Sequence, residues 1–214
     1  MKGSLRPAGD SSRGLSRSDL RLIAELIEPR SRVLDIGCGE GDLLEYLVRE
    51  MGVIGRGMEL SQEGVNASVT RGLSVVQGDA DTALGYYPDA AFDTVVLSKT
   101  LQATREPREV LRQLVRIGRR AIVSFPNFGY WRIRLELLLK GRMPMTPSLP
   151  APWYETENIH LCTLRDFVAL CEQERIRVEK AFTVRDDGSP RPITSLGRAN
   201  LFGHDGVFLL RADR

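Results

Sequence analysis

A strand that runs into a glycine-rich turn and then into a helix is the feature that most constrains how this chain can fold. Residues 32–36 (RVLDI) are typical of a buried strand, Gly37, Gly39 and Gly41 follow it, and leucines at helical spacing predict a helix over 42–51. Glycines in such a turn let backbone N–H groups approach a ligand without a clash from Cβ. The segment therefore predicts an α/β fold with a ligand at the carboxyl end of this strand.

Strand and helix signals alternate along the first 126 residues, which is typical of a mostly parallel sheet with helices on both faces. After Pro126 two late strands, 178–184 and 206–211, have no full helix between them, which predicts an antiparallel pair at one edge of the sheet. The expected helices are 18–27, 42–51, 62–71, 107–117, 130–140 and 163–174, and the earlier strands are 32–36, 53–60, 73–77, 92–98 and 121–125.

The composition fits one globular domain with a flexible start. Of the 214 residues, 42% are hydrophobic and 27% are charged, which is enough to bury one sizeable core. Residues 1–15 are rich in Gly, Ser, Arg and Pro and are expected to form a flexible tail. We expect 16–214 to form a single domain, within which the stretch 126–160 is an insertion or lid.

Charge and cysteine content narrow the function classes. The 30 Lys and Arg residues against 28 Asp and Glu residues give a net charge of +2, which argues against nucleic-acid binding by bulk charge. Cys38, Cys162 and Cys171 are odd in number and lack CxxC spacing, so we expect neither a disulfide scaffold nor a metal site. No apolar signal segment or membrane-spanning stretch is found in the sequence, so a cytoplasmic protein without a membrane partner is expected.

Carboxylates follow the ends of successive expected strands, where open α/β sheets bind their ligands. Glu59 can accept both hydroxyls of a ribose, Asp79 can accept the amino group of a purine, and Asp35 can face an ammonium group. A dinucleotide fingerprint needs its third glycine at position 42, where Asp42 stands, and Glu40 and Asp42 would repel a pyrophosphate. The pattern favours a nucleotide-like ligand with a cationic or zwitterionic end over a nicotinamide cofactor.

Each of these residues also has a structural alternative. A glycine-rich turn often does no more than connect two secondary-structure elements, Asp35 can cap a helix, and Glu59 can be a solvated loop acid. Three glycines combined with acids after three consecutive strands favour the ligand-binding interpretation.

The turn 33–41 (VLDIGCGEG) resembles motif I of class I S-adenosylmethionine-dependent methyltransferases, and Glu59 and Gly78-Asp79 match the ribose and adenine positions that follow it. The chain from about 18 to 211 also resembles the MetW family of methionine biosynthesis proteins. The blocks that carry this resemblance are 19–23, 97–104, 124–131 and 153–160. The resemblance implies a Rossmann-like class I methyltransferase fold with a mostly parallel seven-stranded sheet and an antiparallel edge pair.

The same resemblance implies S-adenosylmethionine or S-adenosylhomocysteine as the cofactor, and homoserine O-acyltransferase of the MetX type as a partner that the protein activates or regulates. Lys99 stands where we expect glutamine in the family, which puts a positive charge beside the cofactor site. The cofactor-binding residues that it implies are Asp35, Gly37, Cys38, Gly39, Gly41, Glu59, Leu60, Gly78, Asp79, Ala80 and Ser98.

Candidate catalytic residues are few. The turn 98–101 has no aromatic or polar clamp, which argues against methylation of nucleic-acid bases. His160 is the first candidate base, Tyr154 is a weaker one, and His204 fits a loop residue better; a lone histidine is often a hydrogen-bonded structural residue. No Ser-His-Asp or Cys-His arrangement favours independent acyl transfer.

The cluster 128–131 (FGYW) and the basic residues Arg132 and Arg134 form either a lid on the sheet or a partner-docking surface. The sequence therefore predicts an S-adenosylmethionine-binding regulatory protein of methionine biosynthesis. The alternative is an active small-molecule methyltransferase whose pocket is closed by 126–160.

Overall fold

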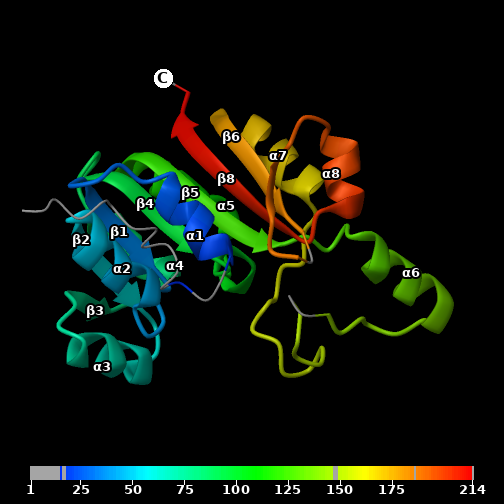
Figure 1. Cartoon of the computed structure of the whole chain (residues 1–214), viewed down its shortest axis with the longest axis horizontal. Helices are drawn as coiled ribbons and strands as arrows, with labels where there is room; N and C mark the ends of the chain where they lie inside the picture. The colour runs from blue at the N-terminus through cyan, green and yellow to red at the C-terminus, as the bar shows by residue number, and fades with distance from the viewer. Residues whose placement is uncertain (1–14, 16–17, 147–148, 186, 214) are drawn as a thin grey trace, which may run out of the picture.

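Eight strands form one sheet in the order β3-β2-β1-β4-β5-β8-β6-β7 (Figure 1). The structure is a computed structural model that describes residues 15, 18–146, 149–185 and 187–213. Strands β1 to β5 are parallel, whereas β8 runs antiparallel to both β5 and β6. The strands are β1 Arg32–Ile36, β2 Ile54–Glu59, β3 Val75–Gln77, β4 Phe92–Ser98, β5 Gly118–Pro126, β6 Ile176–Val184, β7 Pro190–Pro192 and β8 Asp205–Ala212.

The predicted parallel sheet with an antiparallel edge is confirmed, but the sheet has eight strands rather than seven. The additional strand is β7, a three-residue Pro-Arg-Pro segment that pairs with the end of β6. Proline cannot donate a hydrogen bond to a neighbouring strand, so within sheets it is confined to edge strands. A segment with two prolines therefore does not resemble a strand in the sequence.

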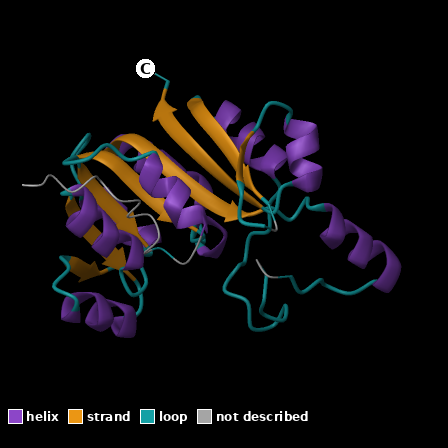
Figure 2. Ribbon diagram, in the orientation of Figure 1, coloured by secondary structure: helices purple, strands orange, loops and turns teal. Residues whose placement is uncertain are grey.

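Helices cover both faces of the sheet (Figure 2). Those expected from the sequence are found to within two residues at either end, whereas α4, α8 and two 3-10 turns were not expected. The helices are α1 Ser18–Glu25, α2 Asp42–Met51, α3 Gln62–Thr70, α4 Ala80–Ala83, α5 Pro107–Ile117, α6 Trp131–Lys140, α7 Leu164–Gln173 and α8 Leu196–Phe202, and the 3-10 turns are η2 Leu84–Tyr86 and η3 Leu101–Ala103.

Alternating side chains of the central strands enter two separate hydrophobic cores. Val95 of β4 packs with α5 and α7 on one face, and its neighbour Val96 packs with α1 and α2 on the other. Leu15, the last residue of the expected flexible tail, is buried in the second core, whereas residues 1–14 lie outside the described residues. No helix among the described residues is long and apolar enough to cross a membrane.

The stretch 126–160, which we call the arm, leaves the sheet after β5, and its helix α6 projects away from the sheet (Figure 1). Gln102, which is buried in η3, contacts both ends of the arm. Its side-chain Nε2 donates to the carbonyl of Pro126 at 3.1 Å, where the arm begins. Its own carbonyl accepts from the N–H groups of Ile159 and His160 at 2.8 and 2.9 Å, where the arm ends.

We expect Phe208→Ala to lower the free energy of unfolding by about 3–5 kcal/mol, because removal of a buried ring leaves a cavity. Phe208 is fully buried, and its ring centroid lies 4.7 Å from that of Phe167 and 5.7 Å from that of Phe125. Phe202→Ala is the control, since Phe202 is 54% exposed, and it should change stability by less than about 1 kcal/mol. Urea denaturation measures both, and equal losses would contradict the packing described.

Candidate functional site

The glycine-rich turn lies at the carboxyl end of β1 and is held by the adjacent strand β2. The N–H of Gly37 donates to the carbonyl of Met58 at 2.8 Å. A Cβ at Gly37 would lie 2.4 Å from the hydroxyl of Thr100, so this position has no room for a side chain. A Cβ at Gly39 would meet nothing within 4 Å, and its φ of +56° is one that glycine adopts at little cost. The turn is therefore packed behind Gly37 and open at Gly39.

The carboxylate of Glu59 connects two turns. Its Oε2 accepts from the N–H of Gly39 at 2.8 Å, and its Oε1 accepts from the N–H of Ser61 at 2.9 Å. Each carboxylate oxygen has a second lone pair, so Glu59 retains acceptor capacity for a ligand. The side chain is thus fixed in place before any ligand arrives.

A cleft of about 530 Å³ opens beside this turn, within the size range of small-molecule sites. The predicted cofactor residues that line it are Gly37, Gly39, Glu59, Leu60, Gly78, Asp79 and Ala80. The lining residues that sequence reasoning missed are Ile36, Ser61, Asp81, Thr100, Ala103, Thr104, Arg105, Glu157 and Ile159. Asp81 has a recognisable signal, since it lies two residues after Asp79 in the segment that follows β3, but nothing in the local sequence points to Glu157 or Ile159.

Four predicted cofactor residues do not line the cleft. Asp35 is buried within β1, and the hydroxyl of Ser98 lies 3.1 Å from that of Ser124. Gly41 begins α2, where a Cβ would lie 2.5 Å from Leu73. Cys38 is partly buried, facing Gly57 of β2. In this structure these residues support the turn from behind.

Neither predicted catalytic side chain lines the cleft. Tyr154 is 69% exposed and makes an edge contact with Trp153. His160 is exposed, and its Nε2 lies 3.1 Å from the carbonyl of Arg105, a residue of the cleft lining. Both remain predictions without a direct contact to the cleft.

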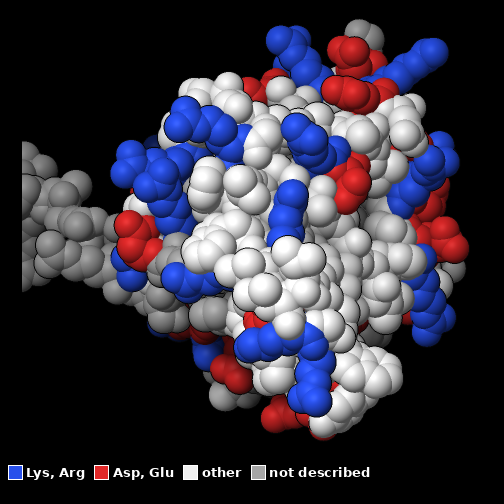
Figure 3. Space-filling model, turned by 90° about the vertical axis from the view of Figure 1, so that its right-hand side faces the viewer, with Lys and Arg blue, Asp and Glu red and all other residues white. Residues whose placement is uncertain are grey.

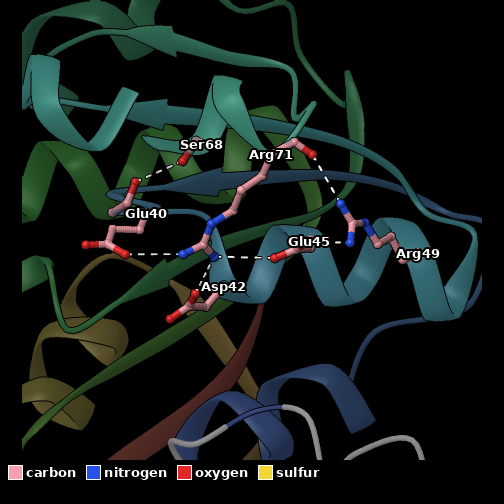
Figure 4. A network of polar contacts seen from close by, with 7 residues as sticks. Glu40, Asp42, Glu45, Arg49, Ser68 and Arg71 are labelled. Atoms are coloured by element: carbon pink, nitrogen blue, oxygen red, sulfur yellow. Dashed lines mark hydrogen bonds and ion pairs between the residues drawn. The ribbon is translucent and has the colours of Figure 1, made fainter. Parts of the chain in front are cut away.

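The acids of the glycine-rich turn are paired with Arg71, which follows α3 (Figure 4). The guanidinium lies 2.6 Å from Asp42, 3.2 Å from Glu40 and 3.3 Å from Glu45. The hydrogen bond to Asp42 is the main reason that the pKa of Arg71 is raised. Glu40 and Asp42 are held by Arg71 and lie outside the lining of the cleft.

The charge of the cleft comes instead from Glu59, Asp79, Asp81 and Glu157, against the single cation Arg105 in its lining. The carboxylate of Asp81 is fixed by the N–H of Arg105 at 2.9 and 3.1 Å. Such a lining gives a negative potential that attracts a cationic ligand.

Lys99, which departs from the family expectation, does not line the cleft. Its φ of +56° is uncommon for a residue with a side chain. Its ammonium group lies 3.3 Å from Asp205 and 4.0 Å from Asp19, so two buried carboxylates offset its charge.

Solved structures with this architecture define the class of protein. An S-adenosylmethionine-dependent methyltransferase from Thermotoga maritima aligns with a TM-score of 0.67 at 17% identity, covering 94% of this chain and 90% of that one. Another from Mesorhizobium loti aligns with a TM-score of 0.66 at 16% identity, covering 92% and 98%. The fold is therefore that of class I S-adenosylmethionine-dependent methyltransferases. Residues 17–210 match the family model of the methionine biosynthesis protein MetW, and the chain belongs to this family.

Two relatives illustrate the range of the similarity. The bifunctional methionine biosynthesis protein MetXA/MetW of Rhodopirellula baltica is 35% identical over 180 residues, which cover 79% of this chain and 29% of that protein. The demethylmenaquinone methyltransferase of Renibacterium salmoninarum is 30% identical over 140 residues, covering 61% and 58%. The chain thus spans less than two thirds of the length of either relative. Among the described residues, no group of three His, Cys, Asp or Glu side chains is placed to hold a metal ion.

The three thiols should be unreactive in the folded protein. Burial raises the pKa of Cys38 to about 12, with Asp35 and Glu59 adding to the shift, and burial also raises the pKa of Cys162 to about 11 and of Cys171 to about 12. A raised pKa keeps each thiol protonated, and only the thiolate attacks a disulfide reagent. We expect slow reaction with Ellman's reagent at pH 8 and fast reaction after unfolding in guanidinium. Equal rates in the two states would contradict this.

Proposed function

We propose that this protein binds S-adenosylmethionine or S-adenosylhomocysteine in the cleft, and that it activates or regulates a homoserine O-acyltransferase of the MetX type. The observation that supports cofactor binding is the position of the Glu59 carboxylate. It accepts hydrogen bonds from the N–H groups of Gly39 and Ser61, and its remaining lone pairs are available to a ligand. The partner half is supported by the Rhodopirellula baltica relative, whose name joins MetXA and MetW in one protein.

The cleft residues fit such a cofactor. The open position at Gly39 leaves room for a ligand against the turn, and Glu59 can accept two ribose hydroxyls. Asp79 lies at the end of β3, where it can accept the amino group of adenine, and the acidic lining suits a sulfonium and an ammonium group. The bound cofactor would supply an activated methyl group.

The cleft lining favours a regulatory role over catalysis. It contains no histidine, tyrosine, cysteine or lysine among the described residues, so the side chains most suited to general-base work near neutral pH are lacking there. Only carboxylates, such as Glu157, remain for this task. Active methyl transfer to a small molecule is the alternative function.

The arm supports a regulatory connection, because Glu157 and Ile159 at its end form part of the cleft wall. A ligand that contacts this wall can favour one position of the arm over another. Regulation by such a difference in affinity corresponds to a coupling of about 1–3 kcal/mol. The proposal needs neither a nucleic acid nor a membrane, and a cytoplasmic location stays a prediction.

Gly39→Arg should abolish binding of S-adenosylmethionine, measured by isothermal titration calorimetry, because the side chain would enter the cleft. Gly72→Arg is a matched control: Gly72 also has a positive φ, of +80°, and open space at its Cβ, but it does not line the cleft. Both variants carry the same backbone strain and charge change, so only Gly39→Arg should lose binding. Retained binding in Gly39→Arg would show that the cofactor site lies elsewhere.

Homoserine acylation by the acyltransferase of the source organism should rise when this protein is added, and saturating S-adenosylmethionine should change the protein concentration that gives half of this rise by about 5- to 150-fold, the range that a coupling of about 1–3 kcal/mol gives. The rate is measured at fixed S-adenosylmethionine, and varying the cofactor then shows whether it regulates. An unchanged rate, with calorimetry still showing cofactor binding, would contradict the partner half. It would favour the methyltransferase alternative.

A further inference from the structure

A stripe of solvent-exposed leucine side chains runs along α6. Leu135, Leu138 and Leu139 are 43%, 80% and 73% exposed, and their i, i+3, i+4 spacing puts them on one face of the helix. The opposite side is anchored, since Ile133 is buried against Tyr130 and Leu149. A helix that is fixed on one side and apolar on the other presents a ready contact surface.

A hollow of about 300 Å³ lies in the arm, and Phe128 and Leu149 of its lining pack around Ile133, on the side of α6 opposite the stripe. Its walls are mostly apolar and include Phe128, Met143, Leu149, Trp153 and Ile159, of which Trp153 is 70% exposed. Ile159 also lines the cofactor cleft, so the two sites share a wall. The hollow is therefore a separate feature from the stripe.

The charge around the stripe indicates the kind of partner. Figure 3 faces this end of the molecule and shows mostly uncharged side chains across its middle, with Lys and Arg side chains between them and side chains of both charges around the edge. Between 131 and 142 the basic residues are Arg132, Arg134, Lys140 and Arg142, and the one acid is Glu136. Glu136 pairs with Lys140 at 2.7 Å. A twofold contact through this helix would bring positive charges together, which disfavours a second copy of this chain.

We infer that the exposed stripe of α6 forms the docking surface for the acyltransferase, through an apolar patch with an acidic rim on that enzyme. The inference rests on the proposed partnership and adds where the contact lies. The stripe supplies apolar anchors, and the arginines and Lys140 pair with acids of the partner.

The test measures the affinity of the full chain for the purified acyltransferase by biolayer interferometry. The double variant Leu138→Ser/Leu139→Ser should bind at least about tenfold more weakly, the loss expected when interface anchors are removed. Tyr86→Ser is the matched control, because Tyr86 is 89% exposed and lies in η2, outside the arm and the cleft lining; it should bind as the wild type does. Raising the salt concentration should weaken the wild-type complex, since the rim contact is electrostatic.

Each other outcome overturns the inference in a distinct way. Unchanged affinity in the double variant, with cofactor binding intact, rejects this surface but leaves the partnership. Absence of any complex with the wild-type chain rejects the surface and the partnership together, while calorimetry still tests the cofactor half by itself. Self-association of the wild type, or binding to anionic phospholipid vesicles, that is lost in the double variant would assign the surface to a second copy or to a membrane.

Discussion

The carboxylate of Glu59 is the contact on which the arrangement of the cleft depends. It receives the N–H of Gly39 from the turn after β1 and the N–H of Ser61 from the turn after β2, at 2.8 and 2.9 Å. Parallel pairing sets Ile36 opposite Met58, so both strands end at the same level and one side chain can reach both turns. Hydrogen bonds to an ionised acceptor are stronger than neutral ones, which keeps the turn open without a ligand.

Local patterns predicted the elements that form this edge of the sheet. The apolar strand 32–36, the glycines after it and the leucine face of 42–51 can each be recognised from a short stretch of sequence. They correspond to β1, the turn and α2. The position of Glu59 and Asp79 beside the cleft was predictable for the same reason, since residues that follow parallel strands lie at the carboxyl edge of the sheet whatever the rest of the chain does.

Contacts between distant parts of the chain were not predictable. Glu157 and Ile159 reach the cleft only because backbone hydrogen bonds place the end of the arm on Gln102, and no sequence periodicity encodes such bonds. Arg71 lies far along the chain from Glu40 and Asp42, so the ion pairs that hold these acids outside the cleft lining were not evident and both were expected to act on a ligand. In both cases the outcome depends on contacts between residues that are distant in the sequence.

Gln102 holds the two ends of the arm together. Its side chain donates to the carbonyl of Pro126, and its carbonyl accepts from the N–H groups of Ile159 and His160. A loop whose two ends are pinned together tolerates changes in its length at small entropic cost, about 0.6 kcal/mol for each doubling. Substitutions or insertions in α6 and the segment after it therefore leave the sheet and the glycine turn undisturbed. Descendants of this chain can therefore change α6, which we propose faces a partner, while they keep the hydrogen bonds that hold Ile159 at the cleft wall.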